Sequence, residues 1–313
     1  MLSYILRRLL ATVPVVLMVA VIVFAVLRLT PGDPASIIAG DSATPEQVQD
    51  LRRHMGLDKP IVTQFLVWGW QLLQGDLGTS LISGQPVSQM VAGRIGPTLA
   101  LASTTLVLTL LLALPLGILA AARQGRLLDR AVMSVSVLGF SVPVFVTGYV
   151  LILLFSIKLG WFPVQGYAPL SSGLGEFLQR LALPSLALST VYVALIARIT
   201  RSSIVEIMGE DFIRTARSKG LTERAVLMRH ALGNAAVPII TIVGVGIGLL
   251  LSGVVVTESV FNLPGLGRLV VEAVLARDYP VIQGLTLLFS LLYILINLIV
   301  DLLYTVFDPR IRY

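Results

Sequence analysis

Six long stretches of the chain contain no Asp, Glu, Lys or Arg, and charged segments separate them. They are residues 9–27, 95–122, 131–157, 181–197, 231–257 and 279–300. A helix needs about 20 predominantly apolar residues to cross the hydrocarbon core of a membrane. The pattern therefore predicts an all-α membrane protein with six transmembrane helices.

Arg7 and Arg8 precede the first apolar stretch, as they would in a signal peptide. That stretch has 19 apolar residues, however, and no small-x-small cleavage pattern accompanies it. We therefore interpret residues 1–28 as a retained transmembrane anchor.

The segment after this anchor is too long for a turn and carries helix signals of its own. Thr44, Pro45 and Gln47 occupy the N-cap, first and third positions of a capping box. Gly56 is placed to end that helix in a left-handed conformation. A short helix is therefore predicted between Thr44 and Gly56.

A second amphipathic stretch, residues 61–74, stops at Gly75 and carries Trp68 and Trp70. One interpretation is a small cap on the outer membrane face, because tryptophan favours the headgroup level. The other is a docking surface for another protein. Under both interpretations residues 29–93 form an extracytoplasmic loop domain.

The loop of residues 198–230 also predicts ordered structure. Its apolar residues recur at intervals of three and four positions, which is typical of one amphipathic helix: Ile204, Ile207, Met208, Phe212, Ile213 and Ala216. Gly220 is placed to close that helix, and Thr222 to N-cap a new one. The periodicity favours a partner-binding helix and a helix lying flat on lipid equally.

Composition supports a membrane protein. The 313 residues are 56% hydrophobic and 13% charged, with a mean hydropathy of +0.91, whereas soluble domains carry about 25% charged residues. The chain has no cysteine, which excludes disulfides and Cys-ligated metal centres. The net charge of +6 resides in short loops, so membrane topology explains it better than nucleic-acid binding.

Loop charges predict the orientation. The side that holds both termini and the loop 198–230 has 14 Lys and Arg, against 9 on the other side. Net charges on the two sides are +7 and −1. Cytoplasmic loops carry the excess of Lys and Arg, so both termini are predicted to be cytoplasmic.

No phosphate-binding GxxxxGKS or GxxxxGKT motif, HExxH or GxSxG is present, so the sequence predicts no catalytic site. His54 and His230 fall in opposite loops, so no metal site is predicted. All charged residues lie outside the six apolar stretches, whereas proton- or sodium-coupled carriers commonly need carboxylates or broken helices near the midplane. Energy for pumping would then come from outside the chain, and a passive channel stays open as an alternative.

Residues 210–221 resemble the EAA loop of ABC importer permeases in its dipeptide and oligopeptide version. They read Glu210-Asp211-Phe212-Ile213-Arg214-Thr215-Ala216-Arg217-Ser218-Lys219-Gly220-Leu221. Other matching stretches are Pro31-Gly32-Asp33-Pro34, Gly56-Leu57-Asp58-Lys59-Pro60, Gly75-Asp76-Leu77-Gly78, Pro264-Gly265-Leu266-Gly267-Arg268, Arg277-Asp278-Tyr279-Pro280-Val281 and Asp308-Pro309-Arg310-Ile311-Arg312. Essentially the whole chain is similar to the first permease subunit of the dipeptide, oligopeptide, glutathione and nickel group.

This resemblance implies a type I importer permease fold in a bacterial cytoplasmic (inner) membrane. Its parts would be an anchor 1–28, an extracytoplasmic loop domain 29–93, a core 94–304 with the coupling loop 198–230, and a cytoplasmic tail 305–313. The implied partners are a second similar permease, two ATP-binding subunits and an extracytoplasmic substrate-binding protein. The chain itself would hold no cofactor, since ATP and Mg would bind the ATPase subunits.

The resemblance also implies site residues. The helix before Gly220 would be the coupling helix, seated in an ATPase groove by Phe212, Ile213 and Ala216. The residues assigned to this coupling loop are Glu210, Asp211, Phe212, Ile213, Arg214, Thr215, Ala216, Arg217, Lys219 and Gly220. In the general EAA pattern a glutamate and a Leu-Pro pair stand where this chain has Arg214 and Gly233, which fits the peptide branch.

An extracytoplasmic mouth is expected where the fifth apolar stretch ends, with a short helix over 266–276 after the Pro264-Gly265 turn. The residues assigned to it are Glu258, Phe261, Pro264, Gly265, Gly267, Arg277 and Asp278. An ordinary connector between spans is the alternative. The implied function is half of a path for di- or oligopeptides or glutathione, with nickel or another small solute, or a non-transporting docking protein, as alternatives.

Overall fold

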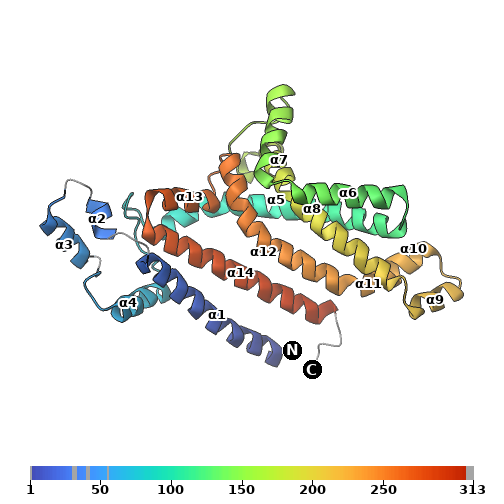
Figure 1. Ribbon diagram of the computed structural model, residues 1–313, viewed down its shortest axis with the longest axis horizontal. Coiled ribbons are helices and arrows are strands. Elements are labelled where there is room, and N and C mark those ends of the chain that lie inside the picture. The colour runs from blue at the N-terminus through green and yellow to red at the C-terminus, as the bar shows by residue number, and fades with distance from the viewer. Residues whose placement is uncertain (1, 30–33, 40–42, 55, 308–313) are drawn as a thin grey trace. The chain divides into compact units, whose positions relative to one another are not determined.

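The computed structural model describes residues 2–29, 34–39, 43–54 and 56–307. The helices run in the order α1 (Leu2–Leu29), α2 (Pro34–Ala39), α3 (Pro45–His54), α4 (Ile61–Leu73), α5 (Val87–Ala122), α6 (Leu127–Ser141), α7 (Val144–Leu151), the π-helix η1 (Ile152–Lys158), the 3-10 helix η2 (Leu170–Ser172) and α8 (Leu174–Ile207) (Figure 1). They continue with α9 (Asp211–Ser218), α10 (Glu223–Ala225), the π-helix η3 (Val226–Ala231), α11 (Leu232–Asn234), α12 (Ala236–Val260), α13 (Leu266–Ala276) and α14 (Tyr279–Phe307).

The chain divides into two compact units. The core unit comprises Met1–Ile5, Gly96–Arg268 and Leu295–Tyr313, and the loop unit comprises Leu6–Ile95 and Leu269–Ile294. In the described ranges the β-type pairing is one isolated antiparallel bridge, between Thr79 and Pro86. The predicted all-α class is therefore confirmed.

Four helices are long and apolar enough to cross a membrane: α5, α8, α12 and α14. The predicted third span adds a fifth if its two bent halves count as one. In α1 the apolar part searched is the shorter segment Leu10–Ala25. Length and composition thus support four or five of the six predicted spans among the described residues.

The predicted continuous span 131–157 is wrong, because the chain bends there by 101° between α6 and α7. The break falls at Pro143. A residue before proline is driven out of the helical region, and Val142 accordingly has φ −89° and ψ 125°. Counting apolar residues alone does not register this proline.

Helix α8 is the central span of the core unit. Of its most apolar 18-residue window 56% is buried, against 28% for the window of α12. Its Leu188 and Tyr192 pack around Gly253 of α12, where an added Cβ would lie 2.6 Å from Leu188 Cδ1. Small residues allow this close approach, which drives helix packing where lipid is the solvent.

In the loop unit the capping box at α3 is confirmed. Thr44 N donates to Gln47 Oε1 at 2.9 Å, and Gln47 N donates to Thr44 Oγ1 at 3.3 Å. Gly56 follows with φ +64°, the left-handed conformation predicted for the residue that ends this helix.

The two tryptophans of α4 lie in different surroundings. Trp68 packs against Phe24 of α1 with ring centroids 5.5 Å apart, and Phe65 makes an edge contact with the same ring. Trp70 is 64% exposed. Trp70 thus presents an exposed ring, while Trp68 packs α4 against α1.

Candidate functional site

The coupling loop ends in the predicted turn. After α9, Gly220 has φ +80°, and Leu221 N donates to Ala216 O at 3.4 Å. Thr222 then caps α10, because its Oγ1 accepts from Ala225 N at 3.4 Å. The left-handed glycine and the N-cap threonine are thus both confirmed.

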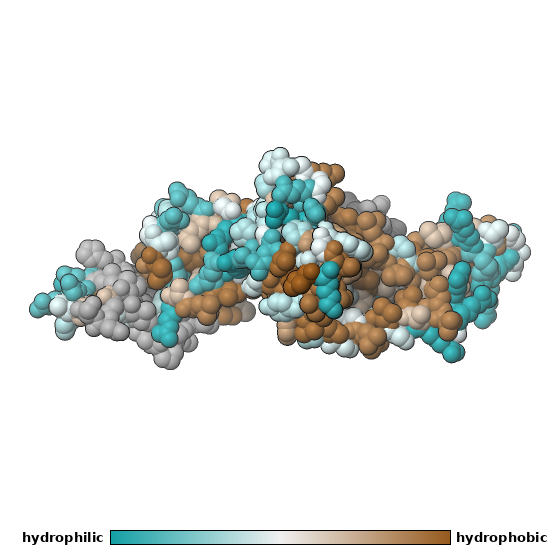
Figure 2. Space-filling model, turned by 90° about the horizontal axis from the view of Figure 1, so that it is seen from above, coloured by the Kyte–Doolittle hydropathy of each residue, from teal (hydrophilic) through white to brown (hydrophobic). Residues whose placement is uncertain are grey.

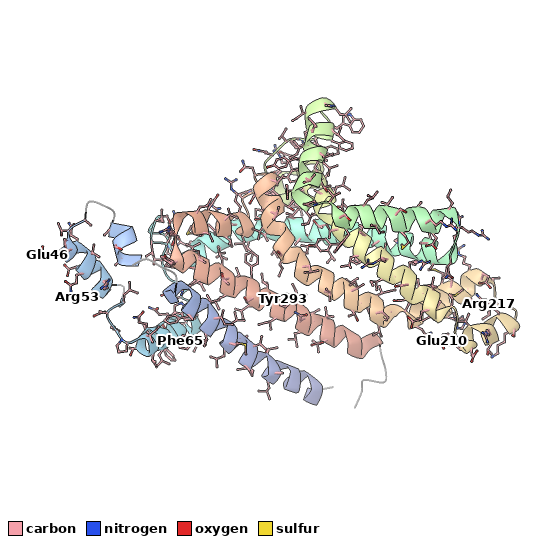
Figure 3. The ribbon with its side chains drawn as sticks, in the orientation of Figure 1. Glu46, Arg53, Phe65, Glu210, Arg217 and Tyr293 are labelled. Carbon is pink, nitrogen blue, oxygen red and sulfur yellow. The ribbon has the colours of Figure 1, made fainter. Side chains whose placement is uncertain are left out.

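The single amphipathic helix predicted across residues 204–216 is wrong. Helix α8 ends at Ile207, and α9 begins only at Asp211. The break contains Gly209, a weak helix former, and Glu210, whose φ −72° and ψ 151° are extended. Figure 3 marks Glu210 before α9 and Arg217 within its last turn.

The apolar face of α9 is largely covered by the chain itself. Ile213 is fully buried and Ala216 is 6% exposed, in a cluster with Ile204 of α8, Val226 of η3 and Ile239 of α12. The expectation that Ile213 and Ala216 seat in a partner's groove is therefore wrong. Phe212 remains 42% exposed, so it is the apolar side chain of α9 that a partner can reach.

The other coupling-loop residues are exposed: Glu210, Asp211, Arg214, Thr215, Arg217, Lys219 and Gly220. Arg214 pairs with Asp211 at 3.1 Å. Arg217 binds both oxygens of Glu223 at 2.8 and 3.1 Å, and this hydrogen bonding holds the pKa of Glu223 below its usual value. The second pair links the last turn of α9 to α10 across Gly220.

An ion pair between α6 and α8 was missed by sequence reasoning. Asp129 is 3% exposed and accepts from Arg201 at 3.0 and 2.8 Å and from Gly125 N at 2.9 Å. It thereby anchors the α5–α6 turn to α8. The only sequence signal is an isolated acidic residue in a basic loop, because 72 positions separate the partners.

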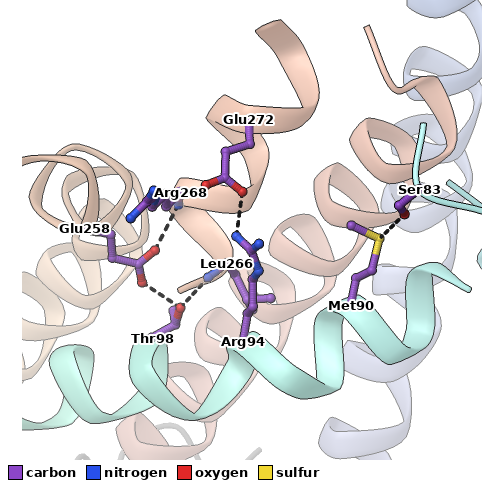
Figure 4. Close-up of polar contacts among 8 residues, drawn as sticks. All are labelled: Ser83, Met90, Arg94, Thr98, Glu258, Leu266, Arg268 and Glu272. Carbon is purple, nitrogen blue, oxygen red and sulfur yellow. Dashed lines mark hydrogen bonds and ion pairs between the residues drawn. The ribbon is translucent and has the colours of Figure 1, made fainter. Parts of the chain in front are cut away.

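The α12–α13 turn is organised around a buried carboxylate. Glu258 lies in the last turn of α12, directly after the apolar stretch 231–257, and has no exposed surface. Thr98 of α5 donates to Glu258 Oε1 at 2.6 Å, and Arg268 N donates to Oε2 at 3.0 Å (Figure 4). Leu266 N in turn donates to Thr98 Oγ1 at 2.8 Å.

This network binds the beginning of α13. The helix has the predicted bounds, Leu266–Ala276, and its first amides donate to Thr98 and Glu258. A carboxylate near a helix N-terminus is favoured by the unpaired amides and by the helix dipole. Glu258 therefore acts as a cap supplied by a neighbouring helix.

Two assigned mouth glycines make room for this carboxylate. A Cβ on Gly265 would collide with the Glu258 carboxylate, and one on Gly267 would lie 2.6 Å from Val255 Cα. Phe261 is 2% exposed in the core cluster, whereas Pro264 is exposed. The structure thus gathers Glu258, Gly265 and Gly267 at one point and turns Pro264 outward.

The other two mouth residues belong to the loop unit. Asp278 is 3% exposed and accepts from the Ser80 hydroxyl and from Leu81 N. Arg277 is exposed and has φ +55°, an uncommon conformation for a residue with a side chain. Nearby in α13, Glu272 accepts from Arg94 at 2.7 Å (Figure 4).

Two matched stretches lie wholly or partly outside the described residues. In the first, Pro31-Gly32-Asp33-Pro34, only Pro34 is described, and the second, Asp308-Pro309-Arg310-Ile311-Arg312, lies wholly outside. Within the described ranges no group of three or more His, Asp or Glu side chains could hold a metal ion.

Comparison with known proteins identifies the class of protein. Residues 113–313 match the family described as binding-protein-dependent transport system inner membrane component, and residues 1–102 match the N-terminal family of such components. The chain belongs to this family, and it is a multi-pass permease of an ABC importer. Members of this family are transport permeases and not ATPases. In general they work with ATP-binding partners and a substrate-binding protein.

Relatives that match over their full length are permeases of peptide and glutathione transport systems. The chain is 49% identical to a probable peptide ABC transporter permease of Sinorhizobium fredii, over 99% of each chain. It is 46% identical to a glutathione transport system permease of Salmonella choleraesuis, over the whole of both chains. Among solved structures the inward-facing MetNI methionine ABC transporter matches with a TM-score of 0.59 at 18% identity, covering 71% of this chain and 97% of that one. This last likeness shows the type I importer permease fold.

Proposed function

We propose that the chain forms one half of the solute path of a peptide importer, with peptides or glutathione as the cargo. The main support is the coupling loop, where α9, the left-handed Gly220 and the capped α10 form an ordered, exposed hairpin. The names of the full-length relatives support the cargo. A second, homologous permease subunit would complete the path, and two ATP-binding subunits would bind ATP and Mg.

The exposed part of α9 would transmit nucleotide binding to the spans. Phe212 would enter the ATPase groove, with Arg214 and Lys219 contacting its rim. Ile213 and Ala216 would fix the helix to α8 and α12 from the other side. Because Ile213 and Ala216 pack α9 against α8 and α12, a displacement of Phe212 would move these helices together with α9 instead of tilting α9 alone.

Opposite the coupling loop, the Glu258 network would hold α13 at the extracytoplasmic mouth. Residues 29–93 would be the extracytoplasmic loop domain, in contact with the binding protein, and residues 94–304 the core. Both termini and the tail 305–313 would be cytoplasmic, as the loop charges of +7 against −1 indicate.

Reconstitution tests the function. The chain would be purified with its second permease, ATPase subunits and binding protein and placed in vesicles. We expect uptake of labelled peptide or glutathione that requires ATP and the binding protein, and no ATP hydrolysis by the chain alone. Uptake without ATP would indicate a passive channel, and retention of all partners without any uptake would indicate a docking protein.

Cysteine labelling tests the orientation, because the natural chain has no cysteine. We expect Gly220→Cys to resist an impermeant reagent in intact cells and to react after the cells are opened. Thr44→Cys and Pro264→Cys should react in intact cells. Labelling of position 220 from outside would reverse the topology.

A further inference from the structure

A cavity of about 730 Å³ lies between three segments of the core unit. One wall is the end of α5 and the turn after it, the second is the end of α8, and the third runs from α9 into η3. In Figure 2 hydrophilic side chains gather on the part of the core unit where α9 and α10 lie, beside hydrophobic surface. The volume of the cavity is in the range of ligand sites, about 300–1,000 Å³.

Four arginines line this cavity and one glutamate accompanies them: Arg123, Arg126, Arg217, Arg224 and Glu223. Glu223 is engaged by Arg217. No carboxylate in the described part of the chain pairs with Arg123, Arg126 or Arg224, all three of which are exposed. Asp129, the acidic residue closest in sequence to Arg123 and Arg126, is bound to Arg201 and does not line the cavity.

Apolar residues complete the lining. Ala121 and Ala122 are the last residues of the apolar run of α5, and Arg123 follows them directly. Val205 of α8, Met208 directly after it and Leu227 of η3 contribute the rest. A run that has just left the hydrocarbon ends at the headgroup level, so the cavity combines an arginine-rich part with an apolar part at that depth.

We propose that this cavity binds the phosphate headgroup of an anionic membrane lipid. Guanidinium groups match phosphate oxygens in pairs of hydrogen bonds, and basic pockets between spanning helices suit such headgroups. Free phosphate would use the arginines but not the apolar residues, and the space is far larger than it needs. The lipid would also touch Arg217 and Arg224 on either side of Gly220, which connects lipid binding to the coupling loop.

The assignment requires only that α5 crosses the membrane, so it stands or falls separately from the proposed cargo and orientation. The assembled transporter would be placed in nanodiscs of phosphatidylcholine, with or without phosphatidylglycerol, and bound lipid counted by native mass spectrometry. We expect retained phosphatidylglycerol that 10 mM inorganic phosphate does not displace. Displacement by phosphate would overturn the lipid as the source of the anion.

A matched pair of double variants tests the location. Arg126→Gln with Arg224→Gln removes two cavity arginines, while Arg130→Gln with Arg229→Gln removes two exposed arginines of the same loops that do not line it. An arginine that contacts an anionic headgroup contributes about 5-fold in affinity, so the cavity pair should weaken phosphatidylglycerol binding roughly 30-fold. The control arginines do not line the cavity and act on the lipid only through screened attraction at longer range, so the control pair should change the binding less than about 3-fold.

Three results would contradict the assignment. Equal losses in both variants would indicate general surface charge, and equal retention of phosphatidylcholine and phosphatidylglycerol would exclude anion recognition. Unchanged lipid binding with loss of the ATPase subunits from the cavity variant would assign the arginines to a protein partner. Complex yield and lipid count are measured on the same sample, so a misassembled variant is identified directly.

Discussion

The coupling loop and the α12–α13 turn both join two helices, but different forces hold them. At the loop the backbone decides the shape, through the positive φ of Gly220 and the exposed Thr222 cap. At the turn a side chain decides it, because buried Glu258 binds Thr98 and the first turn of α13. The loop should therefore tolerate changes of side chain and fail on changes of backbone freedom, whereas the turn should fail when one carboxylate is lost.

The largest effect is expected for Glu258→Ala. It would leave the buried Thr98 hydroxyl and Arg268 amide without this acceptor, and open a cavity. Removing one partner from a buried charged network costs about 3–5 kcal/mol. We expect a large fall in the amount of assembled permease and in its melting temperature, measured in detergent.

Glu258→Gln is the matched control, because it keeps the volume and one acceptor oxygen. It should recover most of the assembled protein while still reducing uptake. Equal stability of the Ala variant and the wild type would show that Glu258 does not hold α13.

Next in size come the glycines beneath this carboxylate. Gly265→Ala and Gly267→Ala would force a methyl group into the Glu258 carboxylate or the Val255 backbone. Overpacking of this kind costs about 1–3 kcal/mol. Gly96→Ala on α5 is the control, since no atom lies within 4 Å of its added Cβ, and its melting temperature should not fall. A fall as large at position 96 would show that loss of glycine, and not crowding, is responsible.

Gly220→Val should have a smaller effect on stability and a large one on coupling. Its Cβ would meet no atom within 4 Å, so the cost is that of the positive φ alone, about 1–2 kcal/mol. We expect normal assembly, lost uptake and ATP hydrolysis no longer stimulated by loaded binding protein. Gly220→Ala should be milder and Gly220→Asn milder still, because asparagine tolerates this conformation. An Asn variant worse than Val would refute the backbone explanation.

The smallest effect concerns Arg217 and Glu223. Because the pKa of Glu223 is lowered in the folded protein, the pair stabilises the loop above the carboxylate's unfolded pKa, and this contribution is lost as the pH falls through the folded pKa. An exposed pair contributes at most about 1 kcal/mol. The protection factor of the Leu221 amide, which compares its exchange rate with that of an unstructured peptide at the same pH, should therefore fall modestly under acid. Glu223→Gln should abolish that dependence without altering uptake.

Local sequence signals predicted local structure well. The capping box at Thr44, the glycine turns at positions 56 and 220, the Thr222 cap and the bounds of α13 each depend on a few neighbouring residues, and all are confirmed. The break in the third span could not be predicted from Pro143 alone, because Pro115 and Pro184 also stand inside apolar runs and their helices α5 and α8 continue past them.

Contacts between distant segments could not be predicted. Hydropathy marks Ile213 and Ala216 as apolar but does not say whether the chain or a partner covers them. Asp129 finds Arg201 72 positions away, and Glu258 finds Thr98 at a distance of 160 positions. No periodicity spans such separations, so the polar networks that organise both ends of the core unit emerge only from the fold.

The separation of Thr98 and Glu258 also bears on biosynthesis. At about 5–20 residues per second, Thr98 leaves the ribosome roughly 8–32 seconds before Glu258, which lies 160 positions later. During that interval α5 enters the bilayer without the carboxylate that its hydroxyl will bind. The α12–α13 turn can close only after five of the six apolar stretches have been synthesised. Closure of this turn is therefore a late step of assembly, which follows the insertion of α5 and requires the end of α12.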